Sequence, residues 1–272
     1  MQQIKILESP GFDQLILDIE ECVKQFSENG VIVYRNANFS KEQQIVLMTK
    51  LGDLLGWDPN SRSEVPGFYQ ENHARKGLSK EDRKNKDEIL IHWHMEHTDF
   101  LNPIIGASWN MHLFTCDTSI GRTGFVDTTV LYELMPKDWQ DFLLNCIEVT
   151  NKEIILEGTK AISNNEIECI KKHWISGKPT IRIDLDTRNV VGIKKINKDE
   201  VTEDDLDLFK TIKEFVFNHI YHNDNIKLVH EWQQGDIVIA DLFRMAHAVY
   251  GGFYPEERDF TGVWAYKDSL KV

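Results

Sequence analysis

Strand-like segments dominate this chain from Ile89 onward, and they follow one another without a regular alternation of helices. Segments 89–96, 107–115, 235–241 and 261–266 are rich in apolar and β-branched residues and are bounded by turn residues. A parallel sheet needs a long crossover, usually a helix, between successive strands. The order of segments therefore disfavours a doubly wound sheet. It predicts a mostly β protein with flanking α-helices, whose strands form a barrel or jelly roll.

Amphipathic segments predict the flanking helices. Residues 13–29 place apolar side chains every three or four positions, and Gly30 follows as a stop signal. Ser40 and Gln43 have the spacing of a capping box, which predicts a helix through Leu54. Further helices are expected at 130–145 and 202–221, and further short strands at 31–35, 178–185 and 189–193.

The length and composition indicate one folded domain over residues 1–272. Hydrophobic residues make up 41% and charged residues 28%, which are values of a globular protein that buries a large core. Residues 56–88 differ, because they lack periodicity and mix both signs of charge. Long irregular segments in compact domains are often lids or binding loops. We therefore predict a lid or insert loop at 56–88.

The charge and the cysteines limit the classes of partner. Lys plus Arg is 31 and Asp plus Glu is 44, so the net charge is −13, which disfavours nucleic acid and anionic membranes as partners. The segment MQQIKILESPGF lacks the apolar stretch of a secretory signal. The four cysteines form no CxxC pair, which disfavours a thiolate zinc site. We expect a cytoplasmic protein with reduced thiols that acts on a small molecule; no pattern indicates the oligomeric state.

Two overlapping pairs of possible metal ligands lie in the stretch HMEHTD. Residues two apart in a strand point to the same side, which applies to His94 and Glu96 and also to His97 and Asp99. An imidazole beside a carboxylate supplies two of the three ligands of a facial triad for non-haem iron. The third ligand must then be a histidine elsewhere in the chain.

The C-terminal stretch HEWQQGDIVIADLFRMAHAVYGGFYPEERDF supplies a histidine at a characteristic spacing. His247 follows Asp241 by six residues, and Arg258 follows His247 by eleven. Before them come the segments WHME at 93–96 and GRTGFVD at 121–127. In this order and spacing, over about residues 30–265, the motifs resemble the taurine dioxygenase-like branch of the Fe(II)/2-oxoglutarate oxygenases.

The resemblance implies a double-stranded β-helix, or jelly-roll, core and a site for Fe(II), 2-oxoglutarate and O2. His94, Glu96 and His247 would bind Fe(II), while Thr123 and Arg258 would hold the distal carboxylate of 2-oxoglutarate. A planar guanidinium suits such a bidentate contact. The implied activity is a dioxygenase that oxidises a small zwitterionic or cationic molecule, such as an amino acid, by hydroxylation and releases succinate and CO2.

The chain departs from the family pattern in two places. The pair His94/Glu96 follows Trp93 and has the usual distance to Pro103, but the alternative pair, His97/Asp99, stays open. Family members that bind a sulfonate carry another arginine four residues after the first, where this chain has Gly262, so taurine is not the expected substrate.

Some alternatives remain at this stage. Trp109, Asn110 and His112 either line the substrate pocket or pack as ordinary strand residues. The rival class is a non-catalytic or 2-oxoglutarate-independent metal-binding jelly roll of the cupin kind. Such a protein has no need for a carboxylate anchor at Arg258.

Overall fold

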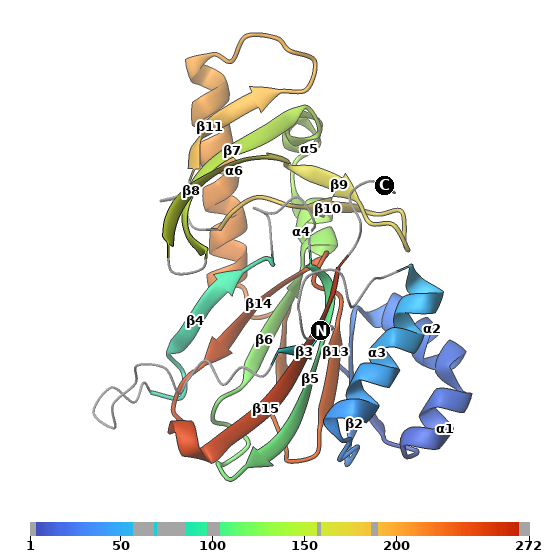
Figure 1. The fold of residues 1–272 in the computed structure, drawn as a ribbon. Coiled ribbons are helices and arrows are strands. Elements are labelled where there is room, and N and C mark those ends of the chain that lie inside the picture. The colour runs from blue at the N-terminus through green and yellow to red at the C-terminus, as the bar shows by residue number, and fades with distance from the viewer. Residues whose placement is uncertain are drawn as a thin grey trace.

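Two β-sheets form the centre of the computed structural model, which describes residues 4–56, 68–69, 85–96, 104–156, 159–185 and 190–266. In the larger sheet the order is β1 (Lys5–Glu8), β2 (Val31–Arg35), β13 (Ile237–Ala240), β5 (Ile104–Phe114), β15 (Arg258–Tyr266) and β3 (Phe68–Tyr69). In the smaller sheet it is β12 (Lys227–His230), β6 (Thr123–Asp127), β14 (Met245–Tyr250) and β4 (Ile89–His94). Apart from the parallel pair β1–β2, neighbouring strands of these sheets run antiparallel (Figure 1).

One hydrophobic cluster lies between the two sheets. The larger sheet contributes Val33, Met111 and Val238, and the smaller sheet contributes Phe125 and Met245. Each of these side chains is at most 1% exposed. Because side chains alternate between the faces of a strand, every second residue of these strands points into this layer. The predicted mostly β architecture with flanking helices is confirmed.

Three helices cover the outer face of the larger sheet: α1 (Phe12–Leu17), α2 (Ile19–Asn29) and α3 (Lys41–Leu55). Gly30 ends α2 in the left-handed conformation (φ 72°), and Ser40 and Gln43 form the predicted capping box of α3. The single helix predicted over 13–29 is divided at Asp18, whose non-helical ψ of 28° separates α1 from α2.

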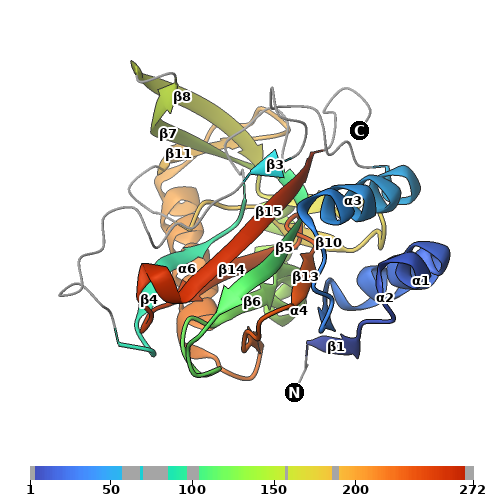
Figure 2. The same ribbon diagram turned by 60° about the horizontal axis from the view of Figure 1, so that its bottom comes forward.

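The outer face of the smaller sheet carries a second layer. It contains α4 (Thr128–Leu134), α5 (Lys137–Leu144) and α6 (Glu203–His222), together with β7 (Cys146–Leu156), β8 (Thr159–Glu168), β9 (Ile170–Lys172), β10 (Pro179–Ile181) and β11 (Val190–Lys195). In Figures 1 and 2, α1–α3 and α6 lie on opposite sides of the two central sheets. A short 3-10 turn (Pro255–Glu257) precedes β15.

Several expectations need correction or lie outside the described residues. The helix predicted over 130–145 is two helices, because Pro136 follows α4 and cannot continue its hydrogen bonding. The hairpin of β7 and β8 was not predicted at all. Most of the predicted lid, residues 57–67 and 70–84, is outside the described residues. Within the described part of the chain, no helix is long and apolar enough to cross a membrane, and the four cysteines are unbonded.

Candidate metal centre

Three possible metal ligands meet where β14 lies between β4 and β6. His247 on β14 is in register with His94 on β4, and their ring centroids are 4.1 Å apart. Glu96 follows β4 directly, and its Oε1 lies 3.4 Å from His94 Nε2 and 3.6 Å from His247 Nε2. The three potential ligand atoms lie within 4.8 Å of one another. The antiparallel pairing thus brings His247 to residues that lie 153 and 151 positions before it in the chain.

The orientation of the His94 ring suits a metal ligand. Its Nδ1 is 2.7 Å from the carbonyl oxygen of His92. A carbonyl only accepts hydrogen bonds, so Nδ1 carries the proton and the lone pair belongs to Nε2. That nitrogen faces Glu96. A backbone carbonyl in this role is typical of metal-binding histidines, since it sets the tautomer and the ring orientation.

The geometry of the cluster fits one divalent ion. Around an ion with bonds of about 2.1 Å, ligand atoms at right angles are about 3.0 Å apart. The two nitrogen-to-carboxylate distances are slightly longer than this, so little movement is needed. The His247 side chain is 6% exposed, that of Glu96 20% and that of His94 37%. One side of the cluster is therefore open to other ligands, as a two-histidine, one-carboxylate site requires.

Arg182, just after β10, holds the backbone around this cluster. Its Nη2 donates to the carbonyl of Glu96 at 3.0 Å, and its Nη1 donates to that of Phe243 at 2.7 Å. Phe243 lies in the turn that leads into β14 and His247. Arg182 is 3% exposed, and burial lowers its pKa to about 10. Arg182 therefore ties the segment bearing Glu96 to the turn that positions His247.

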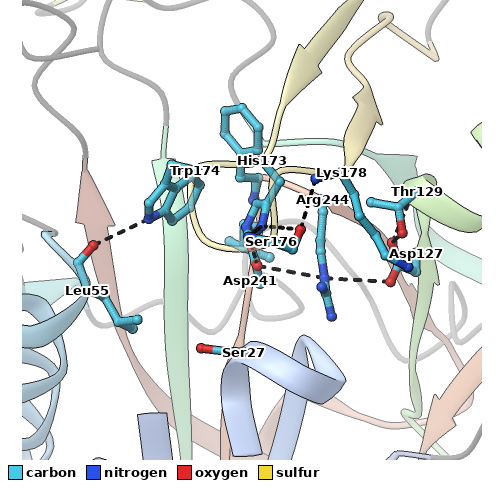
Figure 3. Close-up of polar contacts among 12 residues, drawn as sticks. Ser27, Leu55, Asp127, Thr129, His173, Trp174, Ser176, Lys178, Asp241 and Arg244 are labelled. Carbon is cyan, nitrogen blue, oxygen red and sulfur yellow. Dashed lines mark hydrogen bonds and ion pairs between the residues drawn. The ribbon is translucent and has the colours of Figure 1, made fainter. Parts of the chain in front are cut away.

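A buried polar network also holds this turn, through Asp241 and Arg244 (Figure 3). The Nε2 of His173 is 2.8 Å from Asp241 Oδ2, and both side chains are fully buried. The backbone N–H of Ser176 donates to His173 Nδ1, so the ring proton belongs on Nε2, facing the carboxylate. Arg244 Nε lies 3.7 Å from Asp241 and 3.6 Å from Asp127. Truncating any member would leave a buried charge or polar atom unpaired.

Arg258, at the start of β15, is buried among aromatic rings. The guanidinium carbon is 5.1–5.4 Å from the ring centroids of Trp232, Phe253 and Phe260. Its Nη1 donates to the carbonyl of Gly121 at 3.2 Å. Burial lowers the pKa of Arg258 to about 10. Burial disfavours the positive charge of the Arg258 guanidinium, so an anion bound beside it would stabilise that charge.

Trp232 connects Arg258 to Thr123. The indole N–H of Trp232 donates to Thr123 Oγ1 at 2.9 Å, while its ring contacts the guanidinium. Because this oxygen accepts, its own hydrogen remains to donate elsewhere. Thr123 shares a strand face with Phe125, which is in register with His247. The structure therefore brings Thr123, on the strand next to His247, and Arg258, on β15 of the other sheet, to the same Trp232 side chain.

Of the three residues left open as pocket or packing residues, only Trp109 faces the cluster. Its ring centroid is 5.7 Å from that of His247. Asn110 is buried and donates to the carbonyl of Phe39, and His112 Nε2 is 2.8 Å from Thr261 Oγ1. The alternative ligand pair, His97 and Asp99, lies outside the described residues.

The sequence matches the family described as taurine catabolism dioxygenase TauD, TfdA family over residues 8–264. The chain belongs to this family. Its cofactors are Fe(II), 2-oxoglutarate and O2, and it is a 2-oxoglutarate-dependent dioxygenase. No curated protein sequence matches it.

Solved structures of other proteins share the fold at low identity. A taurine dioxygenase from Burkholderia xenovorans is 14% identical with a TM-score of 0.64, over 97% of this chain and 88% of that one. A structure of AAD-2 in complex with Mn(II) and N-oxalylglycine is 12% identical with a TM-score of 0.66, over 98% and 96%.

Sequence reasoning missed Arg182 and Trp232. The signal for Arg182 was a single cation within the apolar segment PTIRIDL, at a position that the fold buries. Trp232 had no signal beyond its place in HEWQQGD. Both residues act through groups that are distant in the sequence.

Proposed function

We propose that this dioxygenase hydroxylates a small zwitterionic or cationic molecule, such as an amino acid, and converts 2-oxoglutarate to succinate and CO2. The observation that carries the proposal is the cluster of His94, Glu96 and His247, together with the buried Arg258. We also infer that the two central sheets are the halves of a double-stranded β-helix. Residues 1–272 would form a single domain with a lid at 56–88.

In this proposal, the two imidazoles and the carboxylate hold Fe(II) on one face. Fe(II) bound there supplies the redox chemistry toward O2. The residues of the chain fix the geometry: the carbonyl of His92 keeps the lone pair of His94 on Nε2, and Arg182 holds the backbone of Glu96. This arrangement favours His94/Glu96 over His97/Asp99 as the ligand pair.

Arg258 and Thr123 would bind the distal carboxylate of 2-oxoglutarate. A buried guanidinium forms strong charge-assisted bonds to a carboxylate because little water competes for it. Trp232 would keep both partners in place through its indole N–H and its ring face. The aromatic rings around Arg258 would exclude water from this end of the site.

The experiment that tests this proposal measures succinate release from 2-oxoglutarate under air with Fe(II). The substrates are free amino acids, small peptides and amines, with taurine as the anionic comparison. Stoichiometric succinate and hydroxylated product from an amino acid or amine would support the proposal. Succinate release stimulated only by taurine or other sulfonates would contradict the substrate class. Failure of 2-oxoglutarate to bind would contradict the cosubstrate site.

A further inference from the structure

Two half-buried tryptophans, Trp109 and Trp264, share the face of the larger sheet that looks toward the metal-ligand cluster. Trp109 on β5 is in register with Gly262 on β15, so both positions face the same way. The contact between Trp109 and the His247 ring identifies that face. Trp264 lies two residues after Gly262 and therefore shares the face.

The indole of Trp264 occupies the space in front of Gly262. A Cβ added at Gly262 would lie 2.4 Å from Cη2 and 2.6 Å from Cζ3 of Trp264. Any side chain at position 262 would thus have to displace this ring. Position 262 is where sulfonate-binding relatives were expected to carry an arginine, and in this protein the Trp264 ring fills the space in front of it.

Both indoles remain partly accessible although their strand neighbours are buried. Ser108 and Asn110 flank Trp109, and Val263 and Ala265 flank Trp264, and all four are 0% exposed. The indoles themselves are only half-buried. The Trp109 ring contacts the His247 ring, and Trp264 packs against the same hydrophobic cluster between the sheets.

We propose that Trp109 and Trp264 form the substrate-recognition wall and bind a positively charged ammonium group of the substrate. The proposal rests on the proposed function and specifies its substrate class. A cation over an indole face is attracted by the negative charge of the ring, most strongly for tryptophan. The net charge of −13 also favours the approach of cations over anions.

The test compares choline with 3,3-dimethylbutan-1-ol, a neutral molecule of the same shape, and with taurine. Protein loaded with Mn(II) and N-oxalylglycine broadens the methyl resonance of a ligand bound near the metal, and protein loaded with Zn(II) is the diamagnetic reference. We expect choline to bind about 2- to 30-fold more tightly than its neutral isostere, which is the range of one cation–π contact. Taurine should bind more weakly than choline.

Substitution of the indoles should remove this preference. In Trp109→Leu and Trp264→Leu proteins, the choline-to-isostere ratio should fall toward one, and Trp264→Phe should keep part of it. Trp139→Leu is the matched control, because Trp139 is equally half-buried but packs edge-on against Phe215 within another cluster. Its ratio should stay at the wild-type value.

Three results would overturn the proposal: no saturable choline binding, equal or tighter binding of the neutral isostere, or an unchanged ratio in both leucine variants. Tighter binding of the isostere would mean that the wall recognises apolar groups. Mn(II) affinity, measured separately by electron paramagnetic resonance, reports on the metal site itself. If Mn(II) does not bind, the proposed function fails, and saturation-transfer spectra of the metal-free protein still decide the indole proposal.

Discussion

Replacing Arg258 with alanine should weaken 2-oxoglutarate binding far more than metal binding. Arg258 is 4% exposed and its guanidinium lies among three aromatic rings, so a carboxylate bound to it interacts in a low effective dielectric. Truncating one partner of a buried, hydrogen-bonded charge pair costs about 2–5 kcal/mol. At about 1.4 kcal/mol per decade, this predicts an affinity loss of about 30- to 4,000-fold.

The assay is calorimetric titration of 2-oxoglutarate into Mn(II)-loaded protein, with Mn(II) affinity measured in parallel. Arg258→Lys should recover part of the loss, since an ammonium is a point charge without the planar fork. Pyruvate lacks the distal carboxylate, so its affinity should change little in either variant. Arg122→Ala is a suitable control, because Arg122 adjoins Gly121 but pairs with Asp87 at 2.7 Å.

Two outcomes would refute this reasoning. An unchanged 2-oxoglutarate affinity in Arg258→Ala protein would remove Arg258 from the cosubstrate site. An equal loss of 2-oxoglutarate and Mn(II) binding would mean that Arg258 acts through the fold. Thermal unfolding shows whether the variant is folded at all. A folded variant that lost both affinities keeps a cooperative unfolding transition, and a misfolded variant does not.

Further predictions concern the metal ligands, their support and the pH dependence of stability. His247→Ala should abolish Mn(II) binding, and Glu96→Ala should do the same while Asp99→Ala retains it; the reverse result would move the site to the alternative pair. Arg182→Met should weaken Mn(II) binding about 10- to 100-fold, as loss of a group supporting metal ligands does, and unchanged affinity would exclude that role. Burial lowers the pKa of His230 in the folded protein below its ordinary value of 6.5. Between pH 6.5 and this lowered pKa, the unfolded chain therefore binds more protons than the folded protein does. Unfolding free energy from urea titrations should therefore decrease over that window, and His230→Gln should reduce this decrease; an equal decrease in the variant would contradict the assignment.

Local patterns predicted the strands and helices that depend on local interactions. Ser40 and Gln43 cap α3 with their own side chains, so four residues suffice to locate its start. The hairpin of β7 and β8 is different. Its segment CIEVTNKEIIL contains glutamate, lysine and asparagine, which have low strand propensity. Its pairing with β11 about 45 residues later stabilises it, and no local pattern reveals that contact.

The candidate site shows the same division. Strand alternation offered two ligand pairs, His94/Glu96 and His97/Asp99, and the resemblance of the motif order to a known family implied the set of His94, Glu96 and His247. The support of the site by Arg182 depends on carbonyl groups of Glu96 and Phe243, which any residue type would present. A backbone acceptor leaves no signature in the sequence. Such a contact becomes visible only when the fold brings the segments together.

A crystal structure of the protein with Mn(II) and 2-oxoglutarate, phased to locate manganese by its anomalous scattering, tests the central claim most directly. We predict one manganese peak bonded to Nε2 of His94, a carboxylate oxygen of Glu96 and Nε2 of His247, with the distal carboxylate of 2-oxoglutarate on Arg258. Manganese bound by His97 and Asp99, or a distal carboxylate bound away from Arg258, would contradict the account.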